Sequence, residues 1–260
     1  MYKIDLKEKV AVVTGGNRGI GKSIVEILLD AGAKVVIFDM QIDAVEELKE
    51  KYGADNVAGY AGSVTDSKEV EKMTKEVVEH FGSYDILVNN AGTSTMDYAV
   101  DIKEEDWDKV MDVNAKGVYL VSQHAARQML KQKDKGKIVN MSSQAGKNGY
   151  RGMGNYVASK HAVIGFTKTM AVELAPEQIN VNAVCPGIVE TAMKHRERVV
   201  GAKVRDMTPE EIEAEDNSQV PLGRTAQPED VAKVVLFLAS EMGDYLTGQA
   251  INVTGGMTMH

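Results

Sequence analysis

The chain is poor in cysteine: only one of its 260 residues, Cys185, carries a thiol. A single cysteine cannot form an intrachain disulfide, which excludes a disulfide-stabilised secreted scaffold. The same shortage fits a reducing compartment, so we predict a cytoplasmic protein. We interpret Cys185 as a buried strand residue rather than as a reactive thiol.

Long hydrophobic runs are also missing. No apolar stretch approaches the roughly 20 residues that span a bilayer, and Val234–Ala239 is typical of the longest. Residues 1–9 contain no apolar signal region, so we expect no secretion. The formal net charge is −8 and the pI is about 5.3, and an acidic chain offers no general electrostatic footprint for nucleic acid or anionic lipid. We therefore predict neither a nucleic-acid nor a membrane partner.

Short β-branched segments alternate with amphipathic segments along the chain, whose composition of 43% hydrophobic and 26% charged residues is that of a globular protein. Such an alternation is typical of the α/β class, with a doubly wound parallel sheet covered by helices on both faces. The predicted strands are Val10–Thr14, Lys34–Phe38, Val57–Tyr60, Ile86–Val88, Lys137–Met141, Asn180–Val184 and Ala250–Val253. The predicted helices are Ile20–Ala31, Ile42–Tyr52, Ser67–Phe81, Glu104–Lys131, Tyr156–Ala175 and Glu229–Ser240.

One segment, Glu190–Gln219, interrupts this alternation. It is polar, strongly charged and helical in pattern. It is either a solvated surface excursion or a lid over a ligand, because ligands in open α/β sheets bind beyond the carboxyl ends of the strands. The chain has no linker and no repeat, so we predict a single domain over residues 1–260 that includes this segment.

A glycine-rich turn follows the first predicted strand and opens a helix. Gly15, Gly19 and Gly21 permit a tight turn and a close approach of backbone to a pyrophosphate, which the helix N-terminus can bind. Any strand-to-helix turn can contain glycines, but Asp39 follows the second strand, where a carboxylate can accept both ribose hydroxyls and repel a 2′-phosphate. Arg18 would favour that phosphate. We give Asp39 the greater weight and predict NAD rather than NADP as the cofactor.

A tyrosine and a lysine, Tyr156 and Lys160, stand four residues apart at the start of a predicted helix, so both lie on one face. The ammonium is expected to lower the pKa of the phenol, which could then exchange a proton with an alcohol. This spacing also arises by chance. Ser143 ends the fifth strand and could hold a substrate oxygen, although a serine there could equally cap a turn. Asn114 lies within a predicted helix and indicates a local break or a bound water, or else is an exposed helical asparagine.

The sequence resembles the classical short-chain dehydrogenase/reductase family over essentially its whole length. The matching segments are Thr14–Gly21, Asn89–Gly92, Asn114, Ser143, Tyr156 with Lys160, Pro186–Gly187, Thr191, Val220–Arg224, Gln227–Asp230 and Tyr245–Gly256. The resemblance implies a Rossmann-type fold, a nicotinamide cofactor and hydride transfer between an alcohol and a carbonyl. It further implies a homotetramer, with the helices near 104–131 and 156–175 packed between subunits.

The same resemblance assigns roles to residues. Tyr156 would be the general acid/base, Lys160 would lower its pKa and hold the nicotinamide ribose, Ser143 would position the substrate oxygen, and Asn114 would anchor a proton-relay water. The residues implied in cofactor binding are Gly15, Asn17, Arg18, Gly19, Ile20, Gly21, Asp39, Ser63, Val64, Asn90, Ala91, Gly92, Tyr156, Lys160, Pro186, Gly187, Ile188 and Thr191. Ser63 departs from the family, whose members often carry an aspartate there that contacts the adenine. We predict no metal site.

The substrate is a small molecule, and the segments around Ser143 and Cys185–Thr191 look most like members that act on polyols, sugars or vicinal diols. Gln144, Asn148 and Met193 are candidate substrate contacts, although both amides could face solvent. A site built to bond hydroxyls rejects substrates that lack them.

Several alternatives remain open at this stage. They are a 3-oxoacyl-thioester reductase, a hydroxysteroid dehydrogenase, a sugar-phosphate dehydrogenase and a catalytically silent nucleotide sensor of the same fold. The basic first half of the polar segment could bind a phosphate, unless nearby acidic residues neutralise its charges. The basic residues are Lys194, His195, Arg196, Arg198, Lys203 and Arg205.

Overall fold

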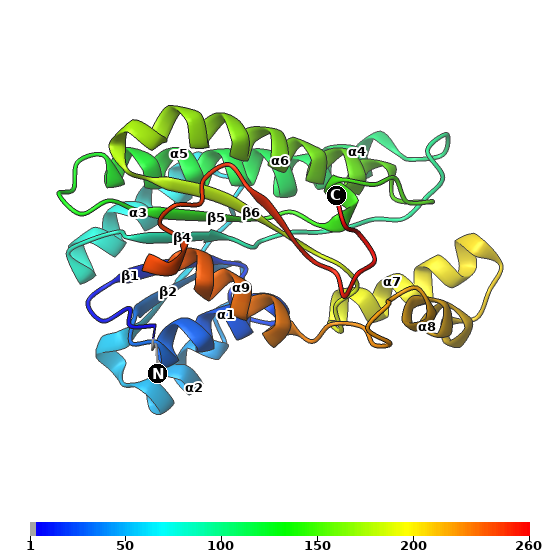
Figure 1. The fold of residues 1–260 in the computed structure, drawn as a ribbon, viewed down its shortest axis with the longest axis horizontal. Helices are drawn as coiled ribbons and strands as arrows, with labels where there is room; N and C mark the ends of the chain where they lie inside the picture. Colours follow the sequence, from blue (N-terminus) through cyan, green and yellow to red (C-terminus); the bar gives the residue numbers. More distant parts are fainter. Residues whose placement is uncertain (1–3) are drawn as a thin grey trace.

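The computed structural model describes residues 4–260, arranged around one seven-stranded parallel sheet (Figure 1). The strand order is β3-β2-β1-β4-β5-β6-β7. Residues 1–3, part of the segment on which the expectation of no secretion rests, lie outside the described residues. The strands are β1 (Val10–Thr14), β2 (Lys34–Asp39), β3 (Val57–Ala61), β4 (Ile86–Asn89), β5 (Lys137–Met141), β6 (Asn180–Pro186) and β7 (Ala250–Val253).

The direction of strand progression reverses between β1 and β4, which pair in parallel with Thr14 opposite Asn89. In open α/β sheets, a crevice forms at such a reversal, outside the carboxyl ends of the strands. The glycine turn after β1 and the loop after β4 therefore meet at one edge of the sheet. This confirms the predicted doubly wound fold.

Helices cover both faces of the sheet, as Figure 1 shows. On one face lie α1 (Gly19–Asp30), α2 (Ala44–Tyr52) and α9 (Pro228–Ala239). On the other lie α3 (Ser67–Phe81), α5 (Gly117–Met129) and α6 (Gly154–Leu174), with α4 (Glu104–Met111) packed on α6. The two remaining helices, α7 (Ala192–Arg205) and α8 (Pro209–Ser218), lie beyond the carboxyl ends of the strands, at the right of the view.

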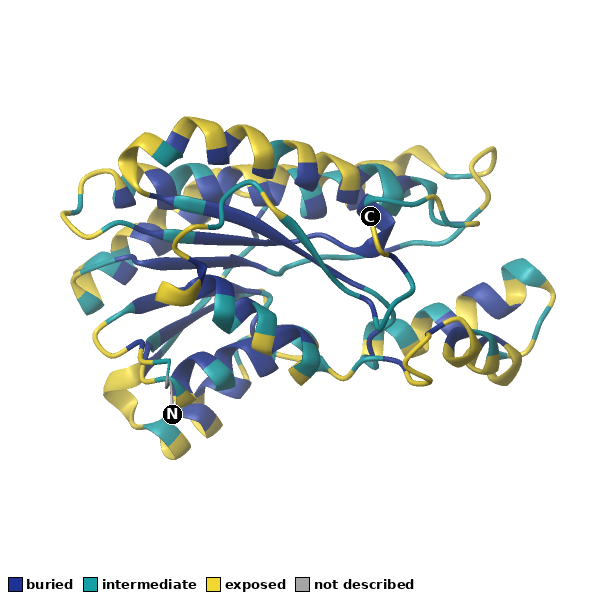
Figure 2. Ribbon diagram, viewed as in Figure 1, coloured by how far each residue is buried: buried dark blue, intermediate teal, exposed yellow. Residues whose placement is uncertain are grey.

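Successive side chains of a strand point to opposite faces of the sheet, so the sheet contributes to two hydrophobic cores. Along β1, Ala11 and Val13 belong to the core under α1 and α9, whereas Val10 and Val12 belong to the core under α3, α5 and α6. Because both faces are buried, the central strands are apolar at nearly every position. Figure 2 shows this dark-blue interior between helices whose outer faces are exposed.

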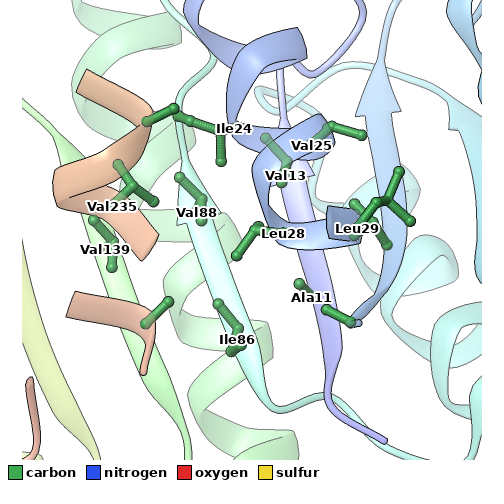
Figure 3. Packing of buried hydrophobic residues seen from close by; sticks show 14 of the residues in the cluster. Ala11, Val13, Ile24, Val25, Leu28, Leu29, Ile86, Val88, Val139 and Val235 are labelled. Atoms are coloured by element: carbon green, nitrogen blue, oxygen red, sulfur yellow. The ribbon is translucent and has the colours of Figure 1, made fainter. Parts of the chain in front are cut away.

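The core under α1 and α9 packs helix residues against strand residues at close range. Leu28 of α1 points toward Ile86 and Val88 of β4, and Val235 of α9 lies beside Val139 of β5 (Figure 3). Val235 and Leu28 are fully buried. This contact fixes α1, and with it the glycine turn, relative to the sheet.

The predicted helix Glu104–Lys131 is interrupted. It consists of α4, a single π-helical segment at Asp112–Lys116 and α5. Asn114 lies in the π segment, so the local break expected there is confirmed. π segments within α-helices frequently occur at functional sites. The helical pattern of apolar residues continues on both sides of the π segment, so the sequence does not show where the break lies.

Two further observations concern the burial of Cys185 and the length of the helices. Cys185 is fully buried in β6, which confirms the expectation of a buried strand residue. No helix within residues 4–260 is long and apolar enough to cross a bilayer.

Candidate active site

The glycine turn places the first residues of α1 against the loop after β4. Gly15 has φ +64°, and a side chain there would come within 2.8 Å of the Ala91 backbone. Asn90 locks the two loops together, because its side-chain amide donates to the carbonyls of Thr14 and Gly15 at 3.0 and 2.9 Å. The turn therefore has no room for a side chain on this side.

The N-terminus of α1 is open on its other side. Helix α1 begins at Gly19, and the preceding Arg18 provides no side-chain cap for the first N–H groups. A side chain on Gly19 would meet only Thr191 within 4 Å, at 3.6 Å. Uncapped N–H groups beside a glycine cradle fit a pyrophosphate. The residues present thus fit a dinucleotide at the predicted place.

Asp39 ends β2 next to this turn. Its carboxylate accepts hydrogen bonds from the backbone N–H groups of Asn17 at 3.2 Å and Gln41 at 3.4 Å. The side-chain oxygen of Asn17 in turn accepts from the N–H of Ala44 at 2.8 Å. Asp39 is half-buried and held in place, whereas Arg18 is exposed.

Ser63 lies in the loop after β3, at the same edge of the sheet. Its hydroxyl is 2.9 Å from that of Thr65, and its N–H donates to Glu69 at 2.6 Å. Val64, also predicted to contact the cofactor, is buried and packs toward Gly117.

Ser143, Tyr156 and Lys160 converge beyond the carboxyl end of β5. Ser143 is buried and its hydroxyl accepts from the N–H of Ala145 at 3.1 Å. The Lys160 ammonium is buried, donates to the Met141 carbonyl at 2.8 Å and lies 5.5 Å from the centre of the Tyr156 ring. The three side chains come from a loop and a helix but share one small region.

The pKa of Tyr156 differs from the expectation drawn from the sequence. Burial raises the pKa of the phenol, the negative charge of Glu197 raises it further, and a hydrogen bond with Ser143 lowers it. The prediction that this pKa is lowered is therefore wrong, since desolvation of the phenolate dominates. Burial also lowers the pKa of Lys160 to about 8.

Asn114 is fully buried and fixes the loop after β4. Its side-chain oxygen accepts from the Thr93 N–H at 2.8 Å, and its amide donates to the Thr93 carbonyl at 2.9 Å and to the Ser159 hydroxyl at 3.0 Å. The π segment turns this amide inward. The alternative of an exposed helical asparagine is excluded.

Of the candidate substrate contacts, two amides lie against the C-terminal segment. Gln144 is buried, with its side-chain oxygen 3.5 Å from the Thr258 hydroxyl and 3.4 Å from the position a side chain on Gly187 would take. The Asn148 amide donates to the same hydroxyl at 3.0 Å. Met193 is half-buried in the first turn of α7. Neither amide simply faces solvent, and that of Asn148 is already hydrogen-bonded.

Helices α7 and α8, together with the preceding Glu190, form a charged unit that is held together by ion pairs. We call this unit the lid, after its expected role. Arg198 is buried, donates two hydrogen bonds to Glu190 at 2.7 and 2.9 Å and a third to Asp216 at 3.0 Å. Lys194 also pairs with Asp216, and Arg205 with Glu215. These three cations are balanced within the lid, which favours the reading that nearby acids offset the basic first half.

The sequence reasoning missed one contact at the lid, between two residues of which it had named Glu197 only as an acid that balances nearby cations. The Ser94 hydroxyl, in the loop after β4, donates to the Glu197 carboxylate of α7 at 2.6 Å. They are 103 positions apart, and no local pattern signals such a contact. Within residues 4–260, no group of three or more potential ligating side chains could hold a metal ion.

Comparisons with known proteins show which family the chain matches. A family model described as Enoyl-(Acyl carrier protein) reductase matches residues 15–258. The chain is 42% identical over 256 residues to the 3-oxoacyl-(acyl-carrier-protein) reductase FabG of Thermotoga maritima, covering 98% of this chain and 99% of that one. The same-named protein of Staphylococcus aureus strain Mu50 is 44% identical, with 96% and 98% covered.

A solved structure has the same fold. The sorbitol-6-phosphate 2-dehydrogenase SrlD of Erwinia amylovora matches with a TM-score of 0.93 and 33% identity, covering 96% of this chain and all of that one. The relatives thus carry names for two different substrates.

Proposed function

The chain belongs to the classical short-chain dehydrogenase/reductase family of oxidoreductases, and from this premise we propose an NAD(H)-dependent enzyme that interconverts a secondary alcohol and a ketone on a small polyhydroxylated molecule. The observation that carries the reaction is the convergence of Ser143, Tyr156 and Lys160 beside the glycine turn. Tyr156 takes the hydroxyl proton of the alcohol during oxidation and returns it during reduction. A bound nicotinamide ring supplies the hydride acceptor or donor.

Each neighbouring residue has a distinct task in this proposal. The Ser143 hydroxyl holds the substrate oxygen beside the phenol. Lys160 places a positive charge 5.5 Å from the centre of the Tyr156 ring, and this charge favours the phenolate that burial disfavours. Ile188 and Thr191, with Pro186 and Gly187, would hold the nicotinamide end of the cofactor.

Asp39 supports NAD over NADP. Its carboxylate stands beside the glycine turn, fixed by two backbone N–H groups, and can accept hydrogen bonds from ribose hydroxyls. A 2′-phosphate at this place would face a like charge in a half-buried site. Arg18 is exposed, and a solvated guanidinium offsets that repulsion only weakly.

The polar lining supports a hydroxylated substrate. Ser94 and Glu197, which are bonded to each other, and the buried Gln144 are polar groups near the candidate site, and a purely apolar substrate would offer them no hydrogen bonds. The names of the 40–44% identical relatives favour a second candidate, reduction of 3-oxoacyl thioesters. A homotetramer remains a prediction from the family resemblance.

A substrate panel tests the proposal. Oxidation of sorbitol, 2,3-butanediol and 2-butanol would be followed by formation of reduced nicotinamide with NAD and with NADP, alongside reduction of a 3-oxobutanoyl thioester. We expect NAD to be preferred, and each useful neighbouring hydroxyl to raise kcat/KM by roughly tenfold over 2-butanol. A thioester turned over orders of magnitude faster than every alcohol would establish the second candidate instead.

A further inference from the structure

One carboxylate of the lid is bonded to the loop after β4 and not to the lid's own cations. Glu197 of α7 is half-buried and accepts a hydrogen bond from the buried Ser94 hydroxyl at 2.6 Å. Ser94 follows Gly92 and Thr93, and Thr93 is held by Asn114 beneath the candidate site. The contact therefore ties the lid to the loop that borders the crevice.

The charge of Glu197 reaches the reacting phenol, since it contributes to the raised pKa of Tyr156. The ion pairs of the lid leave this carboxylate out: Lys194 and Arg198 pair with other acids, and Arg196 contacts the Ser94 carbonyl at 3.5 Å. Only one of its two oxygens, Oε1, is engaged by a hydrogen bond from residues 4–260. Its Oε2 accepts no hydrogen bond from residues 4–260.

We propose that Glu197 is a specificity-determining residue that accepts hydrogen bonds from the hydroxyl groups of a neutral polyhydroxylated substrate and repels substrates carrying an anionic group near the reacting carbon. This inference rests on the proposed function and narrows it. A carboxylate is an acceptor only, so it pairs well with hydroxyl donors and poorly with phosphate or carboxylate. Ser94 positions it by holding Oε1.

A preference for neutral substrates would distinguish this chain from the solved structure that it resembles. That protein is named as a dehydrogenase of sorbitol 6-phosphate, which carries an anionic group. Here three cations of the lid, Lys194, Arg198 and Arg205, are paired with acids. Because the charge of Glu197 acts on the reacting phenol, sorbitol should be a better substrate than sorbitol 6-phosphate.

The test compares Glu197→Gln with wild type, using sorbitol and sorbitol 6-phosphate with NAD. Glu210→Gln is the matched control, because Glu210 is an exposed carboxylate on α8 without a hydrogen-bond partner among residues 4–260. We expect Glu197→Gln to lower kcat/KM for sorbitol by about tenfold, as loss of a charged hydrogen bond would. It should narrow or reverse the preference for sorbitol over its phosphate, whereas Glu210→Gln should change neither.

A second readout is the pH dependence of sorbitol oxidation. Removing the Glu197 charge lowers the pKa of Tyr156, so the rise of kcat/KM with pH should move to lower pH in Glu197→Gln and stay unchanged in Glu210→Gln. Ser94→Ala should reproduce part of the loss on sorbitol while cofactor binding stays at the wild-type level. If wild type oxidises sorbitol and Glu197→Gln matches it on both substrates, this inference is overturned. If wild type oxidises no neutral alcohol, the proposed function itself fails.

Discussion

At the scale of single residues, burial sets the chemistry of the candidate site. The Tyr156 phenol and the Lys160 ammonium are removed from water together, which raises the pKa of the first and lowers that of the second to about 8. Each shift disfavours the charged form. Near neutral pH, Lys160 is still mostly charged, so it can stabilise a phenolate that forms during proton transfer.

Tyr156→Phe should reduce alcohol oxidation by at least a hundredfold, because the proton acceptor is lost while the ring remains. Dinucleotide binding, measured by calorimetric titration, should stay within a few-fold of wild type. Tyr245→Phe is the control, since Tyr245 is fully exposed, and it should behave as wild type. If Tyr156→Phe kept a tenth of the activity, the acid/base assignment would be wrong.

Asp39→Ser should shift the cofactor preference toward NADP by about tenfold or more, because the carboxylate that binds the ribose and repels a 2′-phosphate is gone. Steady-state kcat/KM with each cofactor measures the shift. Asp43→Ser removes an exposed carboxylate only four positions away and should leave the preference unchanged. An equal shift in both variants would point to net charge and not to Asp39.

At the scale of elements, the lid depends on one buried guanidinium. Arg198 bridges Glu190, which follows β6, and Asp216 of α8, with side chains that are 4%, 19% and 11% exposed. Its hydrogen bonds lower the pKa of Glu190 below its usual range. Ion pairs therefore join α7 and α8 to the segment that follows β6.

Arg198→Met should destabilise the lid by on the order of 3 kcal/mol near pH 7, because Glu190 loses its guanidinium partner and Asp216 keeps only Lys194. The pKa of Glu190 is lower in the folded protein than its ordinary value of 4.5, so this carboxylate stabilises the fold at pH values above 4.5. The contribution is lost as the pH falls below 4.5 toward the pKa of the folded state. The difference in unfolding free energy between wild type and Arg198→Met should therefore shrink below about pH 4.5. Denaturant unfolding and limited proteolysis across a pH series measure it.

The control for this prediction is Arg224→Met. Arg224 pairs with Asp230 at 2.6 Å but is 58% exposed, so its removal should have little effect at any pH. A pH-independent difference for Arg198→Met would contradict the assigned ion pair.

At the scale of the whole molecule, one sheet shared by two cores holds the site together. The central strands carry the glycine turn, the β4 loop and Ser143 at their carboxyl ends, and each helix layer fixes the strands from one side. A weakened core should therefore lower stability everywhere before it changes the chemistry.

Val235→Ala removes two buried methyl groups between α9 and the sheet. The unfolding free energy should fall by about 2 kcal/mol, from lost burial plus a residual cavity, while kcat of the folded enzyme stays near wild type. Val100→Ala is the matched control, because Val100 is 92% exposed, and it should be neutral in denaturant unfolding. Similar losses in both variants would mean that this core does not govern stability.

The sequence by itself determined the features that depend on neighbours along the chain. The seven strands and most helix bounds follow from apolar periodicity, and the glycine turn and Asp39 follow from strand ends that must meet at one edge. Tyr156 and Lys160 share a face because they lie one helical turn apart. These inferences needed no knowledge of long-range contacts.

Only the tertiary structure decided what depends on distant partners and on burial. The inward turn of Asn114 requires the loop after β4 to accept its amide, and the contact of Ser94 with Glu197 joins residues 103 positions apart. The raised pKa of Tyr156 arises from desolvation, which no spacing encodes. The physical reason is the same in each case: hydrogen-bond partners and loss of water are properties of the packed chain, whereas periodicity is a property of the sequence.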